Sequence, residues 1–245
     1  MGIPDDCLQN VIDFPWWVRD DGQTLCRGRL VYVNLPHVMG EQATLEVEGR
    51  NEPTEHRKAV YSVKALRYPE VRDASVQKLP VAAIPKYHGE TLLVQRAKVR
   101  PAIVLTAELM EIPRGLRMGE TKHWTNPTAI VAPSYGATPD GRAAPNPELL
   151  KRFRHCEYPN YMCLWLPKTS RNGIQLEDFP SIVRLDQMQP IGTHLHNYEL
   201  TTARLSERAL SILNDWLVWL HTGILPEGEL KFFREYLLEL YATKT

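Results

Sequence analysis

The sequence predicts a mainly β fold, a small, strongly curved antiparallel barrel with peripheral helices. Nineteen prolines are spread through the 245 residues, and proline is poorly tolerated inside helices. Short runs of β-branched and aromatic residues alternate with polar, turn-forming segments, which is typical of short strands that close into a barrel. The hydrophobic content of 43% is sufficient for one large domain with a buried core.

The expected strands are rich in valine, isoleucine, leucine, threonine and aromatic residues, and each ends at a polar segment. In chain order they are residues 28–35, 59–66, 91–96, 101–106, 128–132, 161–166, 181–187 and 197–202. We expect the last of these strands to pair near 181–187.

Two helices are expected after these strands. Ser206 suits the N-cap position before an apolar stripe that ends at Gly223, a residue favoured just after a helix. Pro226 opens a second apolar stripe within a C-terminal extension, residues 226–245. Such apolar stripes either pack on the core of the barrel or form the interface of a dimer. We expect them to pack on the core.

The charge balance bears on the partners. The chain has 29 basic residues (lysine plus arginine) and 29 acidic residues (aspartate plus glutamate), so no excess of positive charge indicates a nucleic-acid partner. A local basic patch that binds nucleic acid is still compatible with this balance. No apolar run approaches the length of a membrane span, and residues 1–6 are acidic. We therefore expect a soluble, cytoplasmic protein with no membrane contact.

Cysteine and histidine spacing bears on metal binding. The four cysteines are Cys7, Cys26, Cys156 and Cys163. None forms a C-x-x-C pair, so we expect free thiols in apolar surroundings. A zinc site, and with it a metal-dependent hydrolase, would need Cys156 and Cys163 to converge with His155, His194 and His196, whose spacing fits no standard finger. We expect no metal and no cofactor.

Two expected strands carry charge where a buried strand normally does not. Side chains alternate along a strand, so Arg184 and Asp186 are expected on one face together with Ile182. Arg100 directly precedes the strand 101–106. An acid/base pair beside a second arginine suits phosphodiester chemistry without a metal. The simpler alternatives are a structural ion pair and a solvated strand end.

These strands also carry motifs in a characteristic order. The motifs are G-R-L-V-Y-V-N-L at 28–35, G-E-Q at 40–42, R-P-A-I-V-L at 100–105, A-I-V-A-P at 129–133, I-V-R-L-D-Q at 182–187 and L-S-E at 205–207. In this order they resemble the MazF/PemK (Kid-like) toxins, a family of RNA endonucleases. The resemblance covers roughly 27–42 and 98–220, and it implies an SH3-like barrel that usually forms dimers and is neutralised by an antitoxin.

The resemblance implies a single domain over residues 1–245, with an insertion at about 43–97 where the family has a short loop. It implies a metal-independent endoribonuclease that cleaves single-stranded RNA as a toxin or defence effector. The implied partners are single-stranded RNA, an antitoxin protein and a second copy of the chain. The alternative is a non-catalytic module on the same barrel that binds nucleic acid or protein.

The resemblance also assigns site residues. At the matched positions, the chemistry of metal-free RNA cleavage makes Asp186 the candidate base that takes the proton of the 2′-hydroxyl, and Arg100 and Arg184 the candidates that stabilise the charged phosphorane. The residues expected to contact RNA are Ser134, Tyr135, Gln187, His37 and Gln42. The acid that protonates the leaving 5′-oxygen is water, His37 or Tyr135, and the sequence leaves these three alternatives open. His37 lies near, but not at, the position of the histidine that some family members have. The family's Ser or Thr after the central strand would have to be replaced by Ser134 or Tyr135. Both departures favour the non-catalytic alternative.

A basic cluster at Lys151, Arg152 and Arg154 precedes Tyr158 and Tyr161. Basic residues interleaved with aromatic ones suit single-stranded RNA, through phosphate contacts and base stacking. The alternative, which we favour, is the charged face of a helix.

Overall fold

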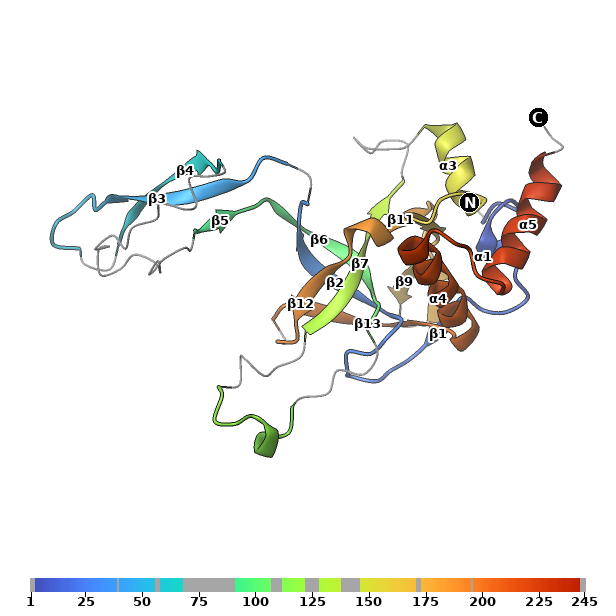
Figure 1. Ribbon diagram of the computed structural model, residues 1–245, viewed down its shortest axis with the longest axis horizontal. Helices are drawn as coiled ribbons and strands as arrows, with labels where there is room; N and C mark the ends of the chain where they lie inside the picture. Colours follow the sequence, from blue (N-terminus) through green and yellow to red (C-terminus); the bar gives the residue numbers. More distant parts are fainter. Residues whose placement is uncertain are drawn as a thin grey trace. The chain divides into compact units, whose positions relative to one another are not determined.

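A computed structural model describes residues 3–38, 40–55, 58–67, 91–106, 112–121, 128–137, 146–170, 173–194 and 196–242. This part of the chain is mainly β, as expected, with antiparallel sheets and a few helices (Figure 1). No sheet closes on itself within the described residues. The chain divides into a core unit, Met1–Asn34 with Val99–Thr245, and a hairpin unit, Leu35–Lys98.

The core unit is organised by an eight-stranded sheet. Its strand order is β1 (Trp17–Arg19), β13 (Tyr198–Leu205), β2 (Arg29–Pro36), β6 (Ala97–Val104), β7 (Thr128–Gly136), β11 (Ser181–Arg184) and β8 (Tyr161–Leu164), with β12 (Gln189–Gly192) paired to β7. A second, two-stranded sheet joins β9 (Pro167–Ser170) to β10 (Gly173–Leu176). The middle strands are apolar because both of their faces are covered, and Leu30, Ile103 and Val131 are fully buried.

Helix α4 (Glu207–Thr222) begins and ends where the sequence predicts. The Ser206 hydroxyl accepts a hydrogen bond from the Ala209 N–H at 3.3 Å. At the other end Gly223 adopts a left-handed conformation with φ 73°, and its N–H donates to the Trp219 carbonyl. The apolar stripe, including Trp216 with 0% exposure, packs into the main core.

Helix α5 (Glu229–Ala242) begins three residues after Pro226 and lies beside α4 (Figure 1). Leu230, Phe233 and Leu237 are buried in the same core, so both predicted stripes cover the core. The other helices within the described residues are short: α1 (Leu8–Val11), α3 (Pro147–Arg154) and the 3-10 turns η2 (Arg114–Leu116) and η3 (Leu185–Gln187). Among the described residues, no helix has both the length and the apolar character that a membrane span requires.

The hairpin unit contains a three-stranded antiparallel sheet in the order β4 (Val60–Ala65), β3 (Ala43–Gly49) and β5 (Leu93–Val94). The expected strand 59–66 is present as β4, and the expected strand 91–96 is reduced to β5. Strand β3 was not predicted. The expected insertion, 43–97, lies within this unit.

Two strand predictions need correction. The expected strand 181–187 ends at Arg184, because Leu185–Gln187 turns into η3. The expected strand 197–202 is β13, which pairs with β1 and β2 rather than near 181–187. Its alternating burial, with Thr201, Ala203 and Leu205 facing the core, suits a strand between those two neighbours.

Candidate functional site

Arg100 and Tyr135 meet across the pair of strands β6 and β7. Ala102 lies opposite Pro133, and the same register two residues further along brings Arg100 beside Tyr135. The guanidinium carbon of Arg100 lies 4.1 Å from the centre of the Tyr135 ring. This cation–π contact orients the guanidinium without using its N–H donors. Among the residues that the structure describes, no carboxylate pairs with Arg100.

The phenol of Tyr135 is fixed from its other end. Its hydroxyl donates a hydrogen bond of 2.6 Å to Oε1 of Gln187, the last residue of η3. Gln187 is only 9% exposed, so its amide oxygen depends on this donor. Arg100, Tyr135 and Gln187 therefore form one connected chain of contacts.

Ser134 lies on the opposite face of β7 from Tyr135. It faces Val183 across the sheet and is 1% exposed. Its hydroxyl has no hydrogen-bond partner among the described residues. Ser134 therefore belongs to the core and is not accessible to RNA in this structure, whereas half-buried Tyr135 is.

Arg184 and Asp186 form a two-pronged ion pair. Nε of Arg184 donates to Oδ1 of Asp186 at 2.7 Å, and Nη2 donates to Oδ2 at 2.6 Å. Asp186 stands in η3, so the turn, and not strand alternation, brings its carboxylate back to Arg184. These hydrogen bonds raise the pKa of Arg184 above its ordinary value. The guanidinium carbon of Arg184 also lies 4.9 Å from the centre of the Tyr161 ring.

Strand register places these groups on one face of the sheet. Ile182 lies opposite both Tyr135 and Cys163, and Arg184, two residues further along β11, lies opposite Tyr161. Alternate residues of a strand share a face, so Tyr135, Ile182, Arg184 and Tyr161 belong to the same face. This face, with Arg100 added, presents two guanidinium groups, one carboxylate and the Tyr135 ring, whereas the Tyr161 ring packs against Phe153 with 4.5 Å between the ring centres. Guanidinium donors match phosphate oxygens, and phenol rings stack on bases.

The basic cluster next to this face stands on helix α3, as the helical alternative predicts. Arg154 is held by Asp6 through hydrogen bonds of 2.7 and 3.1 Å, and Arg152 contacts the Tyr158 hydroxyl at 3.5 Å. The rings of Phe153 and Tyr158 are 5.7 Å apart, edge to face. These contacts attach α3 to the core unit, which favours the structural interpretation of the cluster.

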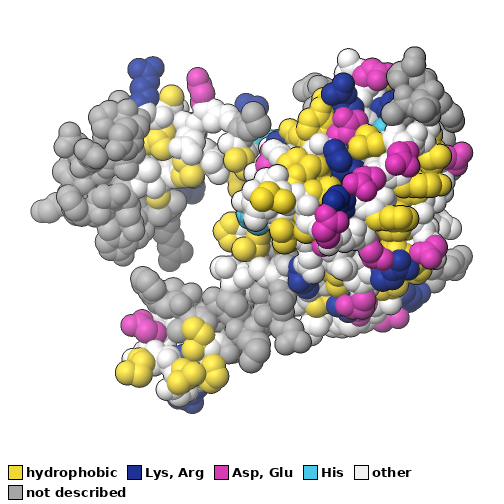
Figure 2. Space-filling view, turned by 45° about the vertical axis from the view of Figure 1, so that its right-hand side comes forward, with side chains coloured by type: hydrophobic (Ala, Val, Ile, Leu, Met, Phe, Trp, Pro, Cys, Tyr) yellow, Lys and Arg dark blue, Asp and Glu magenta, His cyan; other side chains and the backbone are white. Residues whose placement is uncertain are grey.

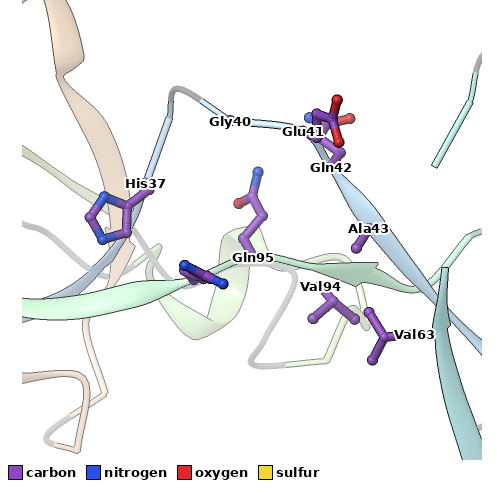
Figure 3. Close-up of a pocket in the computed structure, with 9 residues that line it drawn as sticks. His37, Gly40, Glu41, Gln42, Ala43, Val63, Val94 and Gln95 are labelled. Carbon is purple, nitrogen blue, oxygen red and sulfur yellow. The ribbon is translucent and has the colours of Figure 1, made fainter. Parts of the chain in front are cut away.

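His37 and Gln42 belong to the hairpin unit and line a pocket of about 620 Å³ there. The N–H of His37 donates to the carbonyl of Arg96 at 2.8 Å. In Figure 3 the side chain of Gln95 points toward the segment from Gly40 to Gln42. These two predicted RNA contacts therefore lie in a different unit from the other six predicted site residues.

The residues proposed for a zinc site do not gather. Among the described residues, no group of three or more His, Cys, Asp and Glu side chains could hold a metal ion. The rings of His194 and His196 lie 5.0 Å apart on the surface, tilted by 40° to each other. Burial raises the pKa of the Cys156 and Cys163 thiols, which keeps them protonated.

The surface of the core unit carries both signs of charge. On the face in view in Figure 2, acidic and basic side chains are interspersed with hydrophobic ones, so that face has no extended basic field. Recognition of an anion there would depend on a few placed arginines rather than on net charge.

Sequence reasoning missed one partner in the site. Tyr161 was considered only as part of the basic and aromatic cluster, yet it is the ring beneath Arg184. Cross-strand register is the signal that identifies it, and that register is not visible in one sequence. Comparison with protein-family models, curated proteins and solved structures found no match for this chain.

Proposed function

We propose that the chain is a metal-independent endoribonuclease that cleaves single-stranded RNA, built on an SH3-like fold of the MazF/PemK type. The observation that carries the proposal is the clustering of Arg100, Tyr135, Arg184 and Asp186 on one sheet face, with Arg100 free of any carboxylate partner within the described residues. We extend the proposal to a toxin or defence effector that acts as a homodimer with an antitoxin partner.

In the proposed reaction, the 2′-hydroxyl of the RNA attacks the adjacent phosphorus. Asp186 takes the hydroxyl proton, and Arg100 and Arg184 bind the phosphate oxygens as negative charge develops on them. The products are a 2′,3′-cyclic phosphate and a free 5′-hydroxyl. The Tyr135 proton is directed at Gln187, which favours water over Tyr135 as the acid that protonates the leaving oxygen.

A second candidate function is supported by the ion pair itself. Both carboxylate oxygens of Asp186 accept hydrogen bonds from Arg184, as in a purely structural pair. Ser134 is buried, so the expected Ser contact with substrate is missing from the face. These two facts favour a non-catalytic module on which Arg100 and Tyr135 bind single-stranded RNA.

The two candidates are separated by incubating purified protein with a long single-stranded RNA in EDTA. We compare the wild type with Asp186→Asn and Arg100→Ala, and use Arg19→Ala as the control because Arg19 is exposed and paired with Asp21. Loss of a general base lowers the rate by about 10²–10⁴. Discrete cuts with 5′-hydroxyl ends, lost in both site variants and kept in the control, support the enzyme.

Folding of each variant is checked by circular dichroism. RNA binding by a folded wild type without any cleavage supports the binding module and overturns the enzyme. Cleavage that survives Asp186→Asn overturns the assignment of the base.

A further inference from the structure

A second polar pocket, of about 560 Å³, lies in the core unit. It is formed by the segment 20–29, the end of β13 and the first turns of α4, and it contains three arginines, Arg27, Arg29 and Arg204. Gly28 bonds to the carbonyl of Val104, at the end of β6 opposite to Arg100. The pocket is therefore separate from the proposed RNA face.

Arg29 forms the rigid part of the pocket. Its side chain is 2% exposed, and Nη2 lies 2.7 Å from Oδ2 of Asp20. Nη1 donates to the carbonyls of Gly22 at 2.5 Å and Thr201 at 3.2 Å. The hydrogen bonds from the Gly22 N–H and from Arg29 lower the pKa of Asp20, which stabilises its charged form. Asp20 thus neutralises Arg29.

Arg204 is also partly neutralised. Its Nε donates to the carbonyl of Arg27 at 3.1 Å, and its Nη2 donates to Glu207 at 3.3 Å. The first of these bonds holds the Arg204 guanidinium against the backbone of Arg27. The side chain of Glu207 is 83% exposed, so its charge is well screened by solvent and compensates Arg204 only weakly.

Among the described residues of the pocket, Arg27 is the cation that lacks a counter-charge. Its Nη2 donates to Oδ1 of Asn214 on α4, which is a neutral partner. Its Nε is buried and has no hydrogen-bond partner among the described residues. A buried, unsatisfied donor on a charged group is costly, so a polar ligand that accepts from this nitrogen would be stabilised.

We propose that this pocket binds the phosphate group of a small ligand. Three arginines against the two carboxylates of Asp20 and Glu207 leave one positive charge, and that charge is on Arg27. Phosphate suits the site because guanidinium forks match its oxygens. Ser211 and Asn214, one turn apart on α4, add polar side chains to the wall. The pocket also has room for the group that carries the phosphate, so the ligand we assign is a phosphate monoester.

The test is titration calorimetry on the full chain with two probes, inorganic phosphate and a nucleoside 5′-monophosphate. The variants are Arg27→Gln, which removes the charge and keeps a polar side chain, and Asn214→Asp, which places a carboxylate beside Arg27. The control is Arg19→Ala, outside the pocket. Loss of a charged contact weakens binding by about tenfold or more.

Binding to the wild type and the control, weakened in both pocket variants, supports the proposal. Tighter binding of the monophosphate than of inorganic phosphate identifies the monoester, and equal binding identifies the free anion as the source of the phosphate group. Absence of binding to folded wild type overturns the proposal. Equal binding by Arg27→Gln and wild type also overturns it. Neither result depends on whether the protein cleaves RNA.

Discussion

Replacement of Tyr135 by phenylalanine removes one hydroxyl and leaves the ring. The lost bond is the 2.6 Å contact to Oε1 of Gln187, a side chain with only 9% exposure. A buried acceptor that loses its donor lowers the free energy of unfolding by about 1–3 kcal/mol. We expect the lower half of that range because Gln187 is not completely buried. For a chain of this length, each kcal/mol lowers the melting temperature by about 2–4 °C.

The same substitution should leave RNA affinity unchanged, because the contact between Arg100 and the ring is retained. Tyr135→Leu removes the ring as well as the hydroxyl. It should therefore lose both the cation–π contact, about 0.5–1 kcal/mol at an exposed site, and base stacking, about 1–3 kcal/mol. Stability and affinity are thus separated by two variants at one position.

Urea unfolding measures the first effect, and fluorescence anisotropy with a labelled single-stranded RNA measures the second. The matched control is the double variant Tyr135→Phe with Gln187→Leu. Removal of both hydrogen-bond partners is nearly neutral, so the double variant should recover most of the stability lost by the single one. An unchanged urea midpoint for Tyr135→Phe would refute the reasoning, and so would a double variant no more stable than the single one.

Two further predictions concern stability. Gly28 has φ +79°, and a Cβ there would lie 2.8 Å from Leu210, whereas Gly223 has φ +73° and open space around it. Gly28→Ala should therefore lower the free energy of unfolding more than Gly223→Ala, which bears only the left-handed strain of about 1–2 kcal/mol. Equal losses of unfolding free energy, measured by urea denaturation, would contradict the overlap of the new Cβ with Leu210. Burial lowers the pKa of His155 below 6.5, despite Asp6 at 3.4 Å, so the unfolded chain takes up the proton first as the pH falls. Unfolding free energy should therefore decrease as the pH drops below about 6.5. His155→Gln should flatten this dependence between about pH 5 and 7, and an unchanged slope would show that another group is responsible.

Local sequence signals predict the fold best where one element carries its own boundaries. Helix α4 has a capping serine before it and a left-handed glycine after it, so both ends are readable from the chain. Strand β3 was missed although its leucine and valine alternate with glutamate in the pattern of a half-buried strand, because this alternation is short and lies in a highly charged segment. The partners of β13 were misassigned because strand pairing is a long-range property that no local window contains.

For the site too, local sequence predicts which residues are involved, whereas their placement depends on turns and strand register. The proximity of Arg184 and Asp186 was predicted, but from strand alternation, whereas the 3-10 turn η3 produces it. Ser134 and Tyr135 were both proposed as RNA contacts, and the sequence alone does not choose between them. Neighbouring residues of a strand face opposite sides, so the register of β7 against β11 places one in the core and the other on the face.

The ion pair of Arg184 and Asp186 also implies that the two arginines of the proposed site have different roles. A carboxylate offers about four lone-pair positions, so two hydrogen bonds from Arg184 orient Asp186 without exhausting its capacity to accept a proton. A guanidinium has five N–H donors, and Arg184 commits two of them to this task. Among the described residues, the guanidinium of Arg100 contacts only the face of the Tyr135 ring, so its donors stay available for a ligand. In the proposed reaction Arg184 positions the base, and Arg100 is the primary phosphate ligand.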